Sequence, residues 1–238
     1  VHWTTPAPVS SGEPKLVEQI DTHILPVRLT PDLDPSFFSV LLGTVFGTLM
    51  AMLRMSKVKP LRYLATAYIE FIRGTPLMVQ LMFIFYGLPM TGIKLPDISW
   101  IPNFSRFAAG IVAMSMNSCA YVAEVIRSGI QSVDAGQSEA AMSLGMNSFQ
   151  RTWYILVPQA LKTILPALGN EFIMIVKDTS LASTFFIGDL MTQYLIVRGA
   201  SYLPLEPLVI VGVIYFILTF LLSKLFGFFE RRMSRADR

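Results

Sequence analysis

The chain has few of the residues from which disulfide scaffolds, zinc clusters and hydrolytic active sites are built. Cys119 is its single cysteine, so neither an intrachain disulfide nor a cysteine-rich zinc cluster can form. Its two histidines, His2 and His23, lie near the N-terminus, away from the apolar segments. The sequence has no G-x-x-x-x-G-K-[ST] loop, so we expect no nucleotide site in this chain. These absences argue against an enzyme, and we expect no metal site and no cofactor held by this chain.

Charged residues are also scarce. They make up 15% of the chain, whereas hydrophobic residues make up 53%, and the mean hydropathy is +0.55. This composition is too apolar for an ordinary soluble domain and indicates that the lipid bilayer is the solvent. The net charge of +3 is a weak argument for nucleic-acid binding, which we do not expect. The sequence therefore predicts an all-α membrane protein.

Five apolar segments are predicted to cross the membrane, at about residues 36–55, 64–88, 107–126, from 164 onward, and 208–229. In the first, Gly43, Gly47 and Ala51 recur every four residues and leave a smooth stripe that another helix can approach closely. The fourth segment contains Pro166, and its first apolar run ends at Lys177 and Asp178. We interpret it as an interrupted span followed by a re-entrant or interfacial helix.

Lysine and arginine are shared unevenly among the connecting segments. The segments after spans one, three and five carry four, three and four of them, and those after spans two and four carry two each. The positive-inside rule then places the N-terminus outside and the C-terminus inside. We expect an extracytoplasmic arm at 1–35, a transmembrane domain at 36–230 with a cytoplasmic loop at 134–162, and a basic cytoplasmic tail at 231–238.

Polar residues inside two of the predicted spans mark a candidate site. Glu70 and Arg73 lie three residues apart on one helical face, just before Pro76, which kinks or loosens a helix. Asn117 and Tyr121 share a face with Glu124 in the third span. Such residues either pair with one another to hold helices together or line a wet cavity. The pattern alone leaves both interpretations open.

The stretch from Glu139 to Pro158 is a moderately polar island between apolar segments. It begins with good helix formers, breaks at Gly145 and restarts after Asn147 and Ser148, both of which are capable helix N-caps. We expect a helix, a glycine turn and a second helix on the aqueous side, which the charge distribution places in the cytoplasm. An ordinary loop helix capped by glycine is the simpler alternative.

The spacing of this stretch resembles the EAA loop of binding-protein-dependent ABC importer permeases. The family pattern is EAA, three residues, G, nine residues and I-x-LP, with Val157 here in place of the usual leucine. Further stretches at 70–81 (EFIRGTPLMVQL), 117–133 (NSCAYVAEVIRSGIQSV) and 169–183 (GNEFIMIVKDTSLAS) resemble the polar amino acid branch, whose members are of histidine, glutamine or arginine type. The residues at the family positions of the loop are Glu139, Ala140, Ala141, Gly145, Ile155 and Pro158.

This resemblance implies the type I permease fold of ABC importers and a multi-pass location in the bacterial cytoplasmic (inner) membrane. It implies a transmembrane permease subunit that forms the translocation pathway and pairs with a second permease subunit, either a copy of itself or a sibling. Two ATPase subunits would hold ATP and Mg²⁺ and dock on the EAA loop. An extracytoplasmic solute-binding protein would deliver a polar amino acid.

An amino acid zwitterion needs a cation for its carboxylate and acceptors for its ammonium group. Arg73 offers a planar, bidentate fork for a carboxylate, and Glu70, Asn117 and Glu124 offer acceptors. The candidate substrate-binding residues are Glu70, Arg73, Thr75, Asn117, Ser118, Tyr121 and Glu124.

Two other classes of function remain compatible with the polar residues. An ion-coupled secondary amino acid transporter would use the membrane carboxylates without ATP and would have no need of the cytoplasmic loop. In a purely structural subunit, the polar residues would only hold helices together.

Overall fold

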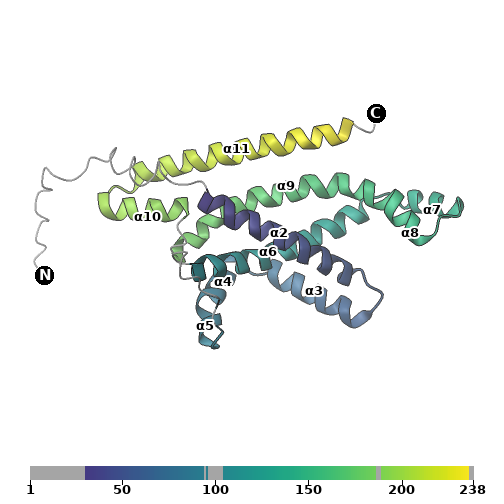
Figure 1. Ribbon diagram of the computed structural model, residues 1–238, viewed down its shortest axis with the longest axis horizontal. Helices are drawn as coiled ribbons and strands as arrows, with labels where there is room; N and C mark the ends of the chain where they lie inside the picture. The colour runs from purple at the N-terminus through teal and green to yellow at the C-terminus, as the bar shows by residue number, and fades with distance from the viewer. Residues whose placement is uncertain (1–29, 94, 96–103, 186–188, 236–238) are drawn as a thin grey trace, which may run out of the picture.

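A computed structural model of the chain describes residues 30–93, 95, 104–185 and 189–235, and everything regular in these ranges is helical (Figure 1). Residues 1–29 of the predicted arm lie outside the described residues. The helices are α2 (Thr30–Arg54), α3 (Lys59–Arg73), α4 (Leu77–Met82), α5 (Leu88–Met90), α6 (Phe104–Gln131), α7 (Ala135–Ser143), α8 (Ser148–Gln150), α9 (Val157–Ala182), α10 (Leu190–Ser201) and α11 (Leu205–Arg235). Short π-helical turns join α4 to α5 (Phe83–Gly87) and α8 to α9 (Arg151–Leu156).

The centre of the bundle is the close packing of α2 against α6. A Cβ atom added at Gly43 would lie 2.4 Å from the Ser118 Oγ, and one at Gly47 would lie 2.9 Å from the Val122 side chain. Ala51, one turn further along, is fully buried. The predicted small-residue stripe is therefore confirmed as the surface on which the two helix backbones approach each other.

The second predicted span is not one straight helix. It consists of α3 and a second helical stretch that begins with α4, and the two meet at an angle of 104°. The break falls at Gly74–Pro76, where Pro76 has no N–H group to continue the helical ladder. The predicted loosening at Pro76 is confirmed, but it turns the chain sharply rather than kinking a continuous span.

The predicted interruption early in the fourth span is wrong. Helix α9 runs unbroken from Val157 to Ala182, through both Pro166 and the Lys177–Asp178 pair. A proline inside a helix removes only one hydrogen bond, and neighbouring helices can stabilise the helix around it. The second helix, expected over the apolar run at 181–191 (LASTFFIGDLM), does not form there as one element: the described part of this run holds the end of α9, a 3₁₀ turn (Ser183–Phe185) and the start of α10. Helix α10 continues further along the chain, and its N-cap Asp189 accepts hydrogen bonds from the N–H groups of Met191 and Thr192.

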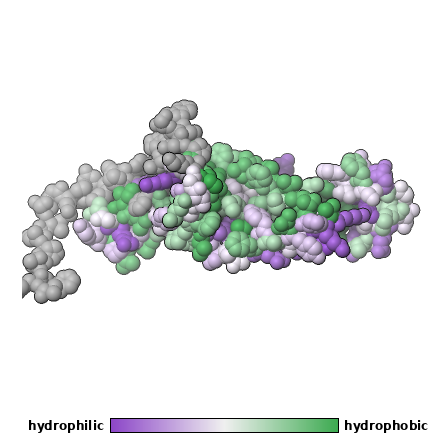
Figure 2. Space-filling view, turned by 90° about the horizontal axis from the view of Figure 1, so that it is seen from below, coloured by the Kyte–Doolittle hydropathy of each residue, from purple (hydrophilic) through white to green (hydrophobic). Residues whose placement is uncertain are grey.

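Among the residues that the structure describes, three helices, α2, α6 and α11, are long and apolar enough to cross a membrane, and the count rises to five if each bent pair forms one span. The α2–α3 connection, the α7–α8 region and the C-terminal end of α11 lie toward the same end of the molecule, and α10 lies toward the other (Figure 1). Figure 2 shows apolar side chains over the middle of one face and more polar ones toward the α7–α8 end. The three lysine- and arginine-rich segments, which follow predicted spans one, three and five and from which the membrane orientation was predicted, therefore lie at the same end of the bundle.

Candidate functional site

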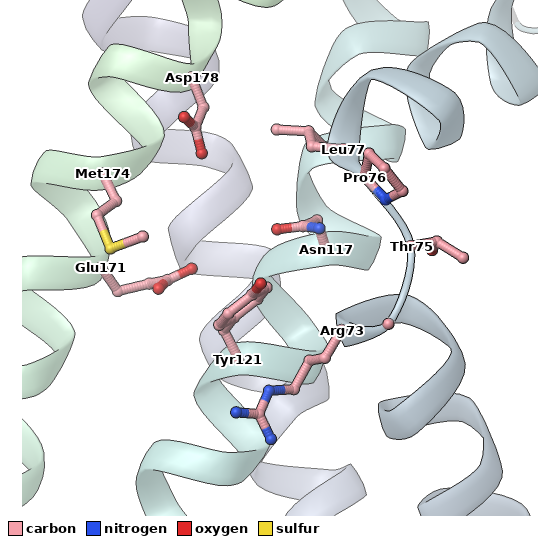
Figure 3. A pocket seen from close by; sticks show the side chains of 10 residues that line it. Arg73, Thr75, Pro76, Leu77, Asn117, Tyr121, Glu171, Met174 and Asp178 are labelled. Carbon is pink, nitrogen blue, oxygen red and sulfur yellow. The ribbon is translucent and has the colours of Figure 1, made fainter.

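A cavity of about 310 Å³ lies where the α3–α4 break faces α6 and α9 (Figure 3). This volume is at the lower end of the range found for small-molecule sites, and it suits a ligand the size of an amino acid. The break itself forms one wall, because Pro76 exposes backbone there instead of continuing the helix. The lining residues are Arg73, Gly74, Thr75, Pro76 and Leu77 at the break, Asn117 and Tyr121 on α6, and Glu171, Met174 and Asp178 on α9.

The α9 wall of the cavity is acidic. Glu171 and Asp178 lie seven residues apart and therefore share a helical face, and Figure 3 shows both carboxylates turned toward the cavity. Glu171 is only 6% exposed. Within the described ranges, no lysine or arginine lies within ion-pair distance of either carboxylate. In the same ranges, no three His, Cys, Asp or Glu side chains are grouped so as to hold a metal ion.

Arg73 supplies the positive end of the cavity. It is the last residue of α3, and its guanidinium lies 5.5 Å from the centroid of the Tyr121 ring, within reach of a cation–π interaction. Its Nη1 also lies 3.6 Å from a carboxylate oxygen of Glu124. The side chain is 40% exposed, so part of its hydrogen-bonding fork remains available to a ligand.

Three predicted substrate residues lie outside this cavity. Glu70 has a side chain that is 69% exposed and lies 3.9 Å from Arg54, whereas Arg73 lies near Glu124; the described residues form no Glu70–Arg73 ion pair. Ser118 is fully buried against α2. Each residue turns an α-helix by about 100°, so Ser118 faces away from the cavity that its neighbour Asn117 lines.

Glu124 belongs to a separate charged cluster. Its carboxylate accepts a hydrogen bond of 2.6 Å from Arg54 and also contacts Arg73 and Arg127. It shares a face with Asn117 and Tyr121 as predicted, but it lies about 10 Å along the helix axis from Asn117, given 1.5 Å per residue. Glu124 therefore ties α2, α3 and α6 together beside the cavity instead of lining it.

The structure thus gathers Arg73, Thr75, Asn117 and Tyr121 from the predicted set and adds Glu171 and Asp178. Sequence reasoning did not assign the last two to the site. Their signal was a pair of carboxylates with helical spacing in an otherwise apolar run, which by itself does not reveal the helix they face.

The Glu139–Pro158 loop forms the predicted helix, glycine turn and second helix. Gly145 has φ of +77°, the Met146 N–H donates to the Ala141 carbonyl, and the Gly145 N–H donates to the Met142 carbonyl. This pair of hydrogen bonds is the Schellman motif, which favours glycine because a Cβ atom strains a positive φ. The second helix starts at Ser148, after the N-cap Asn147. The side chains of Asn147 and Gln150 each accept a hydrogen bond from the other residue's backbone N–H, which is a capping box.

The surface of this loop carries several exposed apolar side chains. Of the family-motif residues, Glu139, Ala140, Gly145 and Pro158 are exposed, Ile155 is partly buried and Ala141 is buried. Large apolar side chains are exposed around them, with Leu144 at 83%. The others are Met142, Phe149, Trp153 and Tyr154. A patch of this kind is typical of a protein–protein contact.

Comparisons with known proteins agree with this geometry. Residues 43–235 match the family described as binding-protein-dependent transport system inner membrane component. The arginine transport system permease protein ArtQ of Bacillus subtilis is 36% identical over 200 residues, which are 84% of this chain and 87% of ArtQ. The putative glutamine transport system permease protein GlnP of Rickettsia conorii is 40% identical over 199 residues, which are 83% and 87% of the two chains.

Solved structures show the same relationship. The crystal structure of an amino acid ABC transporter with histidines superimposes with a TM-score of 0.80 at 42% identity, over 92% of this chain and 95% of that one. The inward-facing MetNI methionine ABC transporter gives 0.64 at 19% identity, over 92% and 98%, and shows the fold alone. The resemblance first seen in the EAA loop is confirmed. The chain belongs to the family of binding-protein-dependent transport system inner membrane components.

Proposed function

We propose that this chain is the permease subunit of an ATP-driven importer of polar amino acids and that the cavity between α3, α6 and α9 binds the substrate in transit. One observation carries the proposal: the cavity has an arginine at one end and two carboxylates on the opposite wall. An amino acid zwitterion carries the complementary charges on one small molecule. Arg73 would hold its carboxylate through a bidentate contact, and Glu171 with Asp178 would hold its ammonium group.

The balance of charge in the cavity favours a substrate with an additional positive charge. The lining contains one cation and two carboxylates, and the cation is already close to Glu124 outside the cavity. Burying an ionised carboxylate costs free energy unless a positive charge pairs with it. An amino acid with a cationic side chain would pair both Glu171 and Asp178, whereas a neutral one would leave one carboxylate without a partner.

For the arrangement in the membrane, we propose five spans with the N-terminus outside and the C-terminus inside the bacterial cytoplasmic membrane. Two features support it: α2, α6 and α11 would supply five crossings together with the two bent pairs if each pair forms one span, and the basic segments lie toward one end of the bundle. This end would be cytoplasmic. The α7–α8 loop would then face the cytoplasm.

We propose that the exposed apolar surface of the α7–α8 loop docks on a separate ATPase subunit that binds ATP and Mg²⁺. A second permease subunit and an extracytoplasmic binding protein would complete the transporter. ATP would shift the equilibrium between the inward- and outward-facing conformations of the transporter, because it binds two arrangements of the ATPase pair with different affinities. Family membership argues against the ion-coupled alternative, which would not require the docking loop.

The substrate proposal is tested by direct binding to the detergent-purified permease–ATPase complex without its binding protein. Radiolabelled L-arginine, L-glutamine and L-glutamate are compared on the wild type and on Glu171→Gln. We expect L-arginine to bind most tightly to the wild type, and Glu171→Gln to reduce that preference. Glu70→Gln is the control, because it removes the same charge from an exposed position outside the cavity. Equal losses in the two variants, or preferred binding of L-glutamate, would refute the proposal.

A further inference from the structure

The break between α3 and α4 leaves two backbone carbonyls without their helical donors. The donor for the Ile72 carbonyl would be the N–H of residue 76, which is a proline and has none. The donor for the Thr75 carbonyl would be the N–H of Val79, which instead donates to the Pro76 carbonyl at 3.0 Å. Inside a membrane, irregular backbone is tolerated only where protein or water satisfies its polar groups.

The side chain of Gln80 satisfies both carbonyls. Its Nε2 donates to the Ile72 carbonyl at 2.8 Å and to the Thr75 carbonyl at 3.1 Å, and it also lies 2.9 Å from the Thr75 Oγ1. Its Oε1 accepts a hydrogen bond of 3.0 Å from the Asn117 Nδ2 on α6. A glutamine amide has two N–H donors and one carbonyl oxygen, so both ends of the group are used. The Ile72 carbonyl also accepts longer hydrogen bonds, of 3.4 Å from the Thr75 N–H and 3.3 Å from the Thr75 Oγ1. Gln80, a half-buried side chain, therefore supplies the shortest of these hydrogen bonds, pairs the Thr75 carbonyl and joins the break to α6.

Two of the three residues that Gln80 contacts, Thr75 and Asn117, line the proposed substrate cavity, whereas Ile72 and Gln80 itself do not. Arg73 lies next to the carbonyl-bearing Ile72, Thr75 lines the cavity directly, and Asn117 faces it from α6. We propose that Gln80 is a positioning residue, which fixes the bend between α3 and α4 and the orientation of Asn117 and thereby sets the affinity of the cavity for its ligand. This inference rests on the proposed function of the cavity.

The first test replaces Gln80 by leucine, which has a similar size but no hydrogen-bonding group. With L-arginine as the probe, we expect the affinity of the purified permease–ATPase complex to fall about tenfold or more. The Thr75 carbonyl loses its Gln80 donor, the Ile72 carbonyl loses its shortest hydrogen bond, and Asn117 loses its acceptor, so the wall of the cavity will rearrange. Gly129→Ala is the matched control. Its added Cβ would lie 2.4 Å from the Ile164 Cγ1, so it strains α6 against α9 without touching a cavity residue. A loss in Gln80→Leu no larger than the loss in an equally destabilised Gly129→Ala would overturn the proposal.

A second test separates positioning from stability. In the Gln80→Leu background, Pro76→Ala supplies an N–H for the Ile72 carbonyl. This hydrogen bond has its best geometry when α3 continues as a straight helix, without the bend that shapes the cavity. We therefore expect the double variant to recover melting temperature while L-arginine binding stays lost. A purely structural role predicts that binding returns together with stability, and that result would overturn the proposal.

Failure of the two proposals can be told apart in the same experiment. A wild-type complex that binds none of the three amino acids would refute the cavity as a substrate site, and the role of Gln80 would fall with it. Wild-type binding of L-arginine that is unchanged in Gln80→Leu would refute only the role of Gln80.

Discussion

The close approach of α2 and α6 allows a quantitative prediction about Gly43. In Gly43→Ala, the added Cβ would lie 2.4 Å from the Ser118 Oγ and 2.6 Å from the Ser118 Cβ, which is far inside van der Waals contact. Both atoms belong to a short side chain on a buried helix face, so the helices must shift apart. Overpacking of this kind costs about 1–3 kcal/mol, and we expect a corresponding loss of thermal stability in detergent, measured by circular dichroism.

The second-site change Ser118→Gly removes both clashing atoms. The nearest remaining atom would be the Cys119 backbone nitrogen at 3.2 Å from the added Cβ. The Ser118 hydroxyl is buried without a hydrogen-bond partner among the described residues, so its removal breaks no hydrogen bond there. Alanine in place of glycine favours a helix by about 1 kcal/mol, and glycine in place of serine disfavours it by about half of that. The double variant should therefore melt close to the wild type.

This pair of variants also separates the two roles considered for Ser118. If Ser118 is a packing residue, Ser118→Gly alone leaves L-arginine binding to the purified complex unchanged. A double variant as unstable as Gly43→Ala would refute the packing argument, and lost binding in Ser118→Gly at unchanged stability would restore the substrate role expected from the sequence.

Three further predictions concern the site and the loop. Arg73→Lys keeps the charge but loses the bidentate fork, so uptake into vesicles should fall about tenfold or more while the complex still assembles; unchanged uptake would argue against carboxylate binding by Arg73. Gly145→Asp puts a Cβ at φ of +77°, at a cost of about 1–2 kcal/mol, and should reduce co-purification of the ATPase without removing the chain from the membrane. Glu139→Arg reverses a charge on the exposed face of α7 and should also release the ATPase; normal recovery with both loop variants would contradict the docking role.

Local features of the sequence were sufficient to predict some of the elements. Apolar run lengths predicted the long helices α2, α6 and α11, and the small-residue stripe of α2 predicted its close packing, because both depend only on composition and periodicity. The α7–α8 loop could be predicted in detail because Gly145 and Asn147 act through hydrogen bonds to residues within a few positions of themselves. Its family motif then identified the family.

Only the tertiary structure decided which polar residues share a cavity. Asn117 and Ser118 are neighbours in sequence, yet one lines the cavity and the other packs on Gly43, because the rotation of α6 about its axis is set by the helices on both sides. Glu171 joins the site through the placement of α9, more than fifty residues along the chain from Asn117. The 104° turn at Pro76 and its support by Gln80 likewise depend on contacts that no local pattern contains. The periodicity of a helix predicts which residues share a face, but only the packing of the helices determines which helix or cavity that face contacts.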